Sequence, residues 1–126
     1  MSANAHYRPN GRERVRTIDS ELLFQQMRSG RRVTIVDIRS AAEFNAPTGH
    51  VPGAISIPLA QLMTRTEELD SSRATSLVVV SADGDSSCLA VIELELAGFL
   101  EARSLEGGIR RWRELALPIE QHVAAG

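Results

Sequence analysis

The chain has 126 residues, of which 43% are hydrophobic and 24% are charged, and its formal net charge is −2. This size and composition predict one globular domain with a single core, and the small net charge gives no general attraction to nucleic acid. A single cysteine excludes an internal disulfide and any multi-cysteine metal site, and the three histidines share no ligand spacing. We therefore expect no metal and no cofactor.

The N-terminal part of the chain is rich in arginine. Residues 1–16 hold four of the fourteen basic residues together with Pro9 and Gly11, which predicts a flexible segment ahead of a domain at 17–120 and a tail at 121–126. No apolar run approaches the ~20 residues that span a bilayer, and the first residues lack the pattern of a signal peptide. The sequence therefore predicts a cytoplasmic protein that contacts neither membranes nor nucleic acid.

Strands and helices are predicted in alternation along the domain. Short apolar runs predict four strands, at residues 33–37, 54–58, 76–80 and 101–105. Apolar residues at helical spacing predict the intervening helices, at residues 17–29, 59–69, 87–97 and 107–115, with a single turn at 41–44. This alternation indicates a mostly parallel sheet covered by helices on both faces, with the strand at 76–80 in its centre. Ligands bind at the carboxyl ends of such strands, so we expect a site in the loop that follows Val80.

Three segments carry motifs of a known family. Residues 36–44 resemble D-x-R-x-x-x-E-[FY], residues 49–58 resemble G-H-I-P-G-A-x-N-I-P, and residues 105–112 resemble L-x-G-G-x-x-x-W. In this order, without large gaps over residues 17–120, they resemble a bacterial-type single-domain rhodanese, a member of the sulfurtransferase family. The resemblance implies an α/β, rhodanese-like fold with a mostly parallel central sheet of about five strands and helices on both faces.

The expected active loop departs from that family. Its pattern there is C-x-x-G-x-R-S, and alignment on Gly84 places Ser81 at the cysteine and Ser86 at the arginine. The family's thiolate accepts a sulfur atom, whereas a serine hydroxyl cannot hold a persulfide and is too basic to attack without a neighbouring base. No histidine or lysine lies near it in the sequence. The degenerate loop comprises Ser81, Ala82, Asp83, Gly84, Asp85, Ser86 and Ser87.

Two acidic residues make a second departure from the family. Asp83 and Asp85 present carboxylates where an anionic sulfur donor such as thiosulfate would enter. We therefore predict an inactive homologue, a rhodanese-homology domain that lacks sulfurtransferase activity and serves as a binding or regulatory module. Its partner would be a protein or a small cationic or neutral ligand that binds at the degenerate loop.

Cys88 supports an alternative from the enzyme class. It lies one residue past the loop, in the first turn of the predicted helix, where the helix dipole favours a thiolate. The alternative is a thiosulfate sulfurtransferase or persulfide carrier that uses Cys88, although a lone cysteine is more often a small buried apolar side chain. A phosphatase, which resembles this fold, requires a cysteine and an arginine in the loop, and both are absent from it.

Four residues of the family motifs are expected to have structural roles. Asp37 and Arg39 are expected to pair beneath the loop, with Glu43 helping to hold the arginine. His50 is expected to anchor the turn that contains it. Ala116 stands where a glycine usually ends the last helix, at a cost of about 1 kcal/mol if the left-handed conformation is kept.

Overall fold

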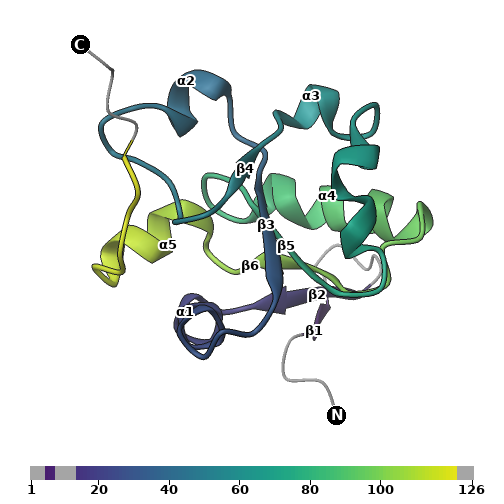
Figure 1. Ribbon diagram of the computed structural model, residues 1–126, viewed down its shortest axis with the longest axis horizontal. Helices are drawn as coiled ribbons and strands as arrows, with labels where there is room; N and C mark the ends of the chain where they lie inside the picture. The colour runs from purple at the N-terminus through teal and green to yellow at the C-terminus, as the bar shows by residue number, and fades with distance from the viewer. Residues whose placement is uncertain (1–4, 8–13, 122–126) are drawn as a thin grey trace.

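One β-sheet forms the centre of the part of the chain that the structure describes (Figure 1). The structure is a computed structural model that describes residues 5–7 and 14–121. Within them, five parallel strands lie in the order β2-β6-β5-β3-β4, and β1 pairs antiparallel with β2 at one edge. The predicted mostly parallel sheet is confirmed. The strands are β1 Ala5–Tyr7, β2 Arg14–Ile18, β3 Val33–Asp37, β4 Ile55–Ser56, β5 Ser76–Val80 and β6 Ala102–Leu105.

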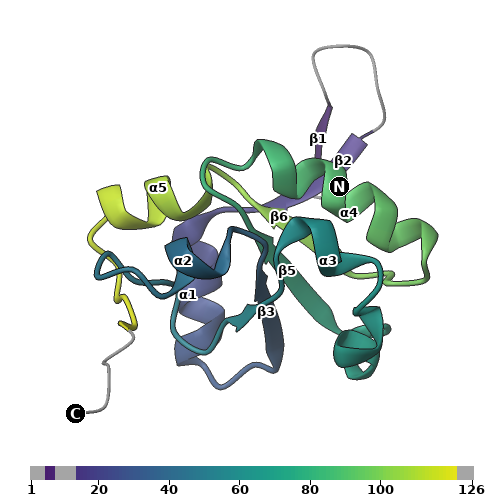
Figure 2. The same cartoon turned by 90° about the horizontal axis from the view of Figure 1, so that it is seen from above.

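Helices cover both faces of the sheet, as predicted. Figure 2 shows α1 and α5 on one side of the strands and α3 and α4 on the other, and the two apolar clusters follow the same division. The helices are α1 Ser20–Arg28, α2 Ala41–Phe44, α3 Leu59–Leu62, the 3₁₀ helix η1 Thr66–Ser72, α4 Asp85–Leu96 and α5 Gly108–Glu114.

The central strand β5 supplies side chains to both apolar clusters. Leu77 and Val79 pack with α3, η1 and α4, whereas Val78 and Val80 pack with α1 and α5, and all four side chains are fully buried. This division follows from the two-residue period of a strand, which points successive side chains to opposite faces. The uninterrupted apolar run therefore marks a strand covered on both sides, and β5 lies between β6 and β3.

The helix predicted over residues 59–69 is two short helices instead. The hydroxyl and the backbone N–H of Thr64 both donate to the carbonyl of Gln61, and Arg65 N–H donates to Leu62. These bonds span three residues and tighten the chain into 3₁₀ turns, which do not extend far. Competition from the threonine hydroxyl thus explains why α3 ends early and η1 follows.

The predicted flexible N-terminal segment contains a strand of the sheet. Residues 14–16 belong to β2, which continues to Ile18 and pairs in parallel with β6. Val15 and Ile18 are fully buried, whereas Arg16 is exposed and pairs with Glu101. Arginines alternate with other residues in this segment, so it resembles a polar, flexible segment in the sequence, although the apolar residues of the strand face the core. The rest of the predicted segment, apart from β1, and the predicted tail beyond residue 121 lie outside the described residues.

Candidate functional site

The loop between β5 and α4 lies at the carboxyl end of the central strand, and the N-terminus of α5 holds it from the side. The backbone N–H groups of Ile109 and Arg110 donate to the carbonyls of Ser81 and Ala82, at 2.9 and 3.1 Å. Gly108 permits this approach, because its φ is +61° and a Cβ there would lie 2.5 Å from the Ser81 carbonyl oxygen. The L-x-G-G-x-x-x-W segment therefore supports the loop that the sequence singled out.

The hydroxyl of Ser81 is buried and fully engaged by the chain itself. The residue is 3% exposed. Its Oγ accepts a hydrogen bond from the Gly84 N–H at 2.9 Å and donates to the Oγ of Ser87 at 3.0 Å. Among the described residues, these contacts include no histidine, lysine or carboxylate that could remove its proton. The contacts of the Ser81 hydroxyl are therefore those of a group that stabilises the local fold.

Further hydroxyls continue from Ser81 into the interior. The Oγ of Ser87 donates to the Gly84 carbonyl at 3.1 Å and lies 2.6 Å from the Oγ of Ser104 in β6. The thiol of Cys88 in turn donates to the Ser104 hydroxyl at 3.7 Å. One assignment of protons satisfies all of these groups, running from Cys88 through Ser104 and Ser87 to the Gly84 carbonyl. These residues form a buried hydroxyl chain beneath the loop.

The alternative nucleophile Cys88 faces the interior. The residue is 9% exposed and lies in the apolar cluster between α4 and the sheet. Its thiol contacts Ser104, on the sheet side of α4. Although Cys88 directly follows the loop in the sequence, its thiol does not lie at the surface of the loop. This arrangement is that of a small packed side chain.

The solvent-facing rim of the loop is acidic. Ala82, Asp83, Asp85 and Ser86 are exposed. The Oδ1 atom of Asp83 accepts a hydrogen bond from the Asp85 N–H at 3.1 Å, so the first amide of α4 is paired with the chain's own carboxylate. Helix N-termini usually offer such amides to anions. Here an approaching anion meets two carboxylates, and a cationic or neutral group fits the charge better.

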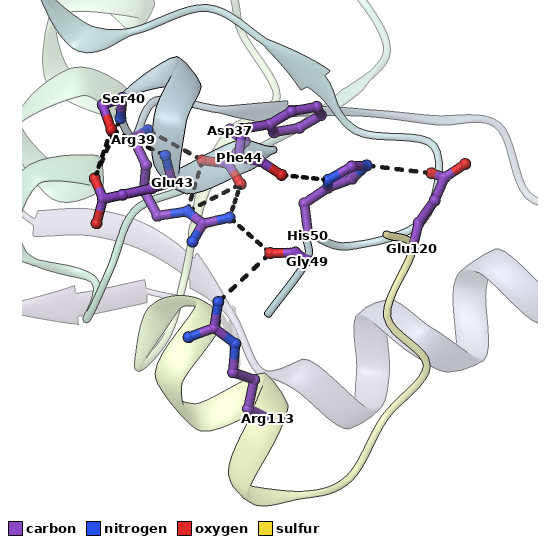
Figure 3. A network of polar contacts seen from close by, with 9 residues as sticks. All are labelled: Asp37, Arg39, Ser40, Glu43, Phe44, Gly49, His50, Arg113 and Glu120. Atoms are coloured by element: carbon purple, nitrogen blue, oxygen red, sulfur yellow. Dashed lines mark hydrogen bonds and ion pairs between the residues drawn. The ribbon is translucent and has the colours of Figure 1, made fainter. Parts of the chain in front are cut away.

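Asp37 and Arg39 form the predicted ion pair at the carboxyl end of β3 (Figure 3). The Nε and Nη2 atoms of Arg39 donate to both carboxylate oxygens at 2.9 to 3.2 Å, and the Arg39 N–H donates to Oδ1 at 3.0 Å. Nη2 also donates to the Gly49 carbonyl at 3.1 Å, and Arg113 of α5 donates to the same oxygen at 3.4 Å. Both members of the pair are buried. The contact of Arg39 with the Gly49 carbonyl joins the pair, and therefore β3, to the turn at Gly49, so the role of the pair is structural.

His50 anchors its turn, as predicted, through contacts on both ring nitrogens (Figure 3). Nδ1 lies 2.8 Å from the Phe44 carbonyl, and Nε2 lies 3.4 Å from the Oε1 atom of Glu120. The ring also stacks on the Phe44 ring, with centroids 3.6 Å apart. Glu120 pairs with His50 through the backbone as well, and its Oε1 accepts from the Gly53 N–H. His50 thus joins the turn to the C-terminal residues of the domain.

Glu43 does not hold Arg39, contrary to the prediction. Its Oε1 accepts from the N–H and the hydroxyl of Ser40, at 3.3 and 3.1 Å, while the Ser40 hydroxyl accepts from the Glu43 N–H (Figure 3). This is a capping box at the start of α2. The pattern of serine followed three residues later by glutamate already indicates such a cap, which explains the local use of the carboxylate.

The site also contains three residues that were not among the candidates predicted from the sequence. Ser104 joins the hydroxyl chain, and Arg113 and Glu120 contact the turn at 49–50. A polar residue within the apolar strand predicted at 101–105 is a signal that could have identified Ser104. Arg113 and Glu120 have no comparable local signal, because their partners are far away in the sequence.

Acidic, histidine and cysteine side chains do not gather into a metal site in the described part of the chain. Residues 5–7 and 14–121 contain no group of three or more of them that could hold a metal ion. Over the same ranges, no helix has the length and apolar character needed to cross a membrane.

Residues 21–115 match the model of the rhodanese-like domain family. The thiosulfate sulfurtransferase GlpE of Shewanella oneidensis is 38% identical over 89 residues, which cover 71% of this chain and 84% of that protein. A sulfurtransferase of Allochromatium vinosum is 33% identical over 105 residues, covering 83% of this chain and 94% of that protein.

A second kind of relative is longer than this chain. The HTH-type transcriptional regulator Rv0324 of Mycobacterium tuberculosis is 34% identical over 109 residues, which cover 85% of this chain but 45% of the regulator, so the chain spans less than half of that protein. Among solved structures, the Alr3790 protein from Anabaena sp. has a TM-score of 0.76 at 27% identity, covering 85% of this chain and 94% of that one. The family match and the shared fold establish that this chain belongs to the rhodanese-like domain family.

Proposed function

We propose that this rhodanese-like domain does not transfer sulfur and instead serves as a binding or regulatory module. The observation that carries the proposal is the environment of Ser81, the residue that aligns with the family's catalytic cysteine. Its hydroxyl is buried and hydrogen-bonded to Gly84 and Ser87. Sulfur transfer requires a sulfur atom that holds the persulfide, and an oxygen at this position cannot replace it.

The charge of the loop supports a ligand of a different kind from thiosulfate. Asp83 and Asp85 are exposed on the rim, and an amide at the start of α4 is paired with Asp83. A cationic or neutral group of a protein or small molecule is therefore the proposed occupant. A relative named as a transcriptional regulator is compatible with a regulatory role. The cytoplasmic location expected from the sequence stays a prediction.

Sulfur transfer from thiosulfate to cyanide tests this proposal directly. We expect no turnover by the wild-type protein or by Cys88→Ser under conditions in which the Shewanella oneidensis thiosulfate sulfurtransferase is active. Turnover that is lost in Cys88→Ser would identify a relocated nucleophile and overturn the proposal. Turnover that persists in Cys88→Ser would overturn it as well, because it would require a reaction without any cysteine.

A second candidate function is a persulfide carrier that uses Cys88. One observation keeps it open, since Cys88 is the single cysteine of the sequence and therefore the residue at which a persulfide could form. The rate of alkylation by iodoacetamide separates the two candidates. A binding module predicts slow alkylation of the folded protein and fast alkylation in denaturant, because Cys88 is buried. Rapid alkylation of the folded protein, with a persulfide detected by mass spectrometry, would favour the carrier.

A further inference from the structure

The helix α4 exposes two leucines on the side that faces solvent, in addition to the apolar residues that face the sheet. Its inner residues Ala90, Val91 and Leu94 are fully buried in the core. On the outer side, Leu89 is 54% exposed and Leu96 is 86% exposed. A helix on the surface of a globular protein normally has a polar outer face, because exposed apolar area is unfavourable in water. The outer face of α4 therefore needs an explanation beyond folding.

The exposed apolar residues follow the spacing with which helices pack together. Leu89, Ile92 and Leu96 lie three and four residues apart, and Leu100, 63% exposed, follows Leu96 by four residues beyond the end of α4. Ile92 is half-buried and connects the row to the core. We call these four residues the α4 seam. Figure 2 shows α4 at the periphery of the molecule. Intervals of three and four residues are those of a helix pair in which side chains interlock.

All of the charged residues of α4 itself are acidic. The charged residues of α4 are Asp85, Glu93 and Glu95, and the helix contains no basic residue. Glu93 is exposed and lies within one helical turn of both Leu89 and Leu96. An apolar row bordered by carboxylates is complementary to a helix whose apolar row is bordered by lysine or arginine.

The arginines nearest the C-terminal end of α4 are already paired. Arg16 forms an ion pair with Glu101, and Arg73 forms one with Asp70 and also donates to the Ala97 carbonyl. They therefore bind groups of the same chain and do not reverse the negative charge along the middle of the α4 seam.

The same charges disfavour a second copy of this chain as the partner. In a two-fold antiparallel pair of α4 helices that sets Leu89 of one copy against Leu96 of the other, the midpoint between these two residues lies on the symmetry axis. That midpoint falls between Ile92 and Glu93, so the Glu93 carboxylates of the two copies would approach each other. Like charges at this spacing are destabilising, which acts against self-association.

We propose that the α4 seam is a docking surface for an amphipathic helix of a partner protein, with an apolar row flanked by lysine or arginine. The partner helix would lie along α4 and cover Leu89, Leu96 and Leu100, with its basic side chains beside Glu93. This inference goes beyond the proposed function. It rests on the outer face of α4 and holds whether or not the neighbouring loop transfers sulfur.

A pair of synthetic peptides tests the docking surface. One is a helix of about 15 residues, with leucine at its a and d positions and lysine at the flanking positions, and the other has glutamate in place of lysine. We expect the lysine peptide to bind the wild-type protein and to shift the NMR amide signals of α4. The glutamate peptide should bind at least about tenfold more weakly, and added salt should reduce this difference.

Single substitutions locate the site. Leu96→Ser should weaken binding of the lysine peptide by about tenfold or more, because one buried leucine side chain contributes at least that factor. Glu93→Lys should also weaken it. Leu59→Ser is the matched control, since Leu59 is 41% exposed on α3 and lies outside the α4 seam. All three residues are exposed, and unchanged circular dichroism confirms that the variants fold.

Several results would overturn the proposal. One is an absence of binding by the lysine peptide at millimolar concentration, and another is equal binding by the two peptides. A third is an equal loss of binding in Leu59→Ser and Leu96→Ser. If light scattering finds a wild-type dimer that Leu96→Ser converts to a monomer, the occupant is a second copy and the proposed partner is wrong. None of these results depends on the sulfur-transfer assay.

Discussion

The hydroxyl oxygens of Ser87 and Ser104 lie 2.6 Å apart in the interior of the protein. Both residues are fully buried, and their contact joins the first turn of α4 to β6. Ser87 also contacts the Ser81 hydroxyl and the Gly84 carbonyl. A buried polar chain stabilises a fold only when each of its members has a partner. Ser87 therefore holds the loop in place from below.

Substitution of this central hydroxyl should reduce stability. We expect Ser87→Ala to lower the free energy of unfolding by about 1–3 kcal/mol, because Ser81 and Ser104 each lose a buried partner. Urea denaturation followed by circular dichroism measures the change. Ser86→Ala is the control, since Ser86 is exposed and its loss should change stability by less than about 0.5 kcal/mol. Equal effects of the two substitutions would contradict a structural role of the buried hydroxyl.

The approach of α5 to the loop should be sensitive to one methyl group. In Gly108→Ala the new Cβ would lie 2.5 to 2.6 Å from backbone atoms of residues 81–83, and we expect a loss of more than about 3 kcal/mol. Gly53→Ala is a matched control, because Gly53 also has a positive φ but has no atom within 4 Å of the added Cβ. It should cost only about 1–2 kcal/mol. Thermal denaturation of both variants tests whether the difference arises from contact with the loop.

Removal of one partner of the buried ion pair should be strongly destabilising. Arg39→Ala leaves the Asp37 carboxylate buried without its partner, and we expect a loss of about 3–5 kcal/mol. Glu114→Ala, which breaks an exposed pair with Arg111, should cost less than about 1 kcal/mol. Guanidinium denaturation compares them. If Arg39→Ala does not accumulate as folded protein, the double variant Asp37→Asn with Arg39→Met should be more stable than Arg39→Ala, because it removes the unpaired charge.

A glycine at the end of α5 should stabilise the protein. Ala116 has a φ of +56°, so the chain keeps a left-handed conformation at this position although the residue is not glycine. Ala116→Gly relieves about 1–2 kcal/mol of strain and loses part of that gain through the greater freedom of the unfolded chain. We expect a net increase of up to about 1 kcal/mol in the free energy of unfolding. Ala60→Gly, on an exposed position of α3, should instead lower stability by about 0.5–1 kcal/mol, and scanning calorimetry distinguishes the two directions.

Local patterns in the sequence predicted most of the framework. The apolar run at 76–80 indicates the central strand, and the motif that contains Asp37 and Arg39 predicts the pair that these residues form. Predictions failed where a longer-range or a competing interaction decided the outcome. Residues 14–16 are extended because they pair with β1, and Thr17 and Ile18 pair with β6. The helix predicted over 59–69 is interrupted near Thr64.

By itself, the sequence determined the family, the alternation of strands and helices, and the absence of a cysteine at position 81, because these depend on residue identity and short spacings. Only the tertiary structure decided the directions and the contacts of individual side chains. It directs the thiol of Cys88 toward Ser104, joins His50 to Glu120 and leaves Leu96 in solvent. The physical reason is that each of these arrangements depends on how distant segments of the chain pack together, and local spacing does not contain that information.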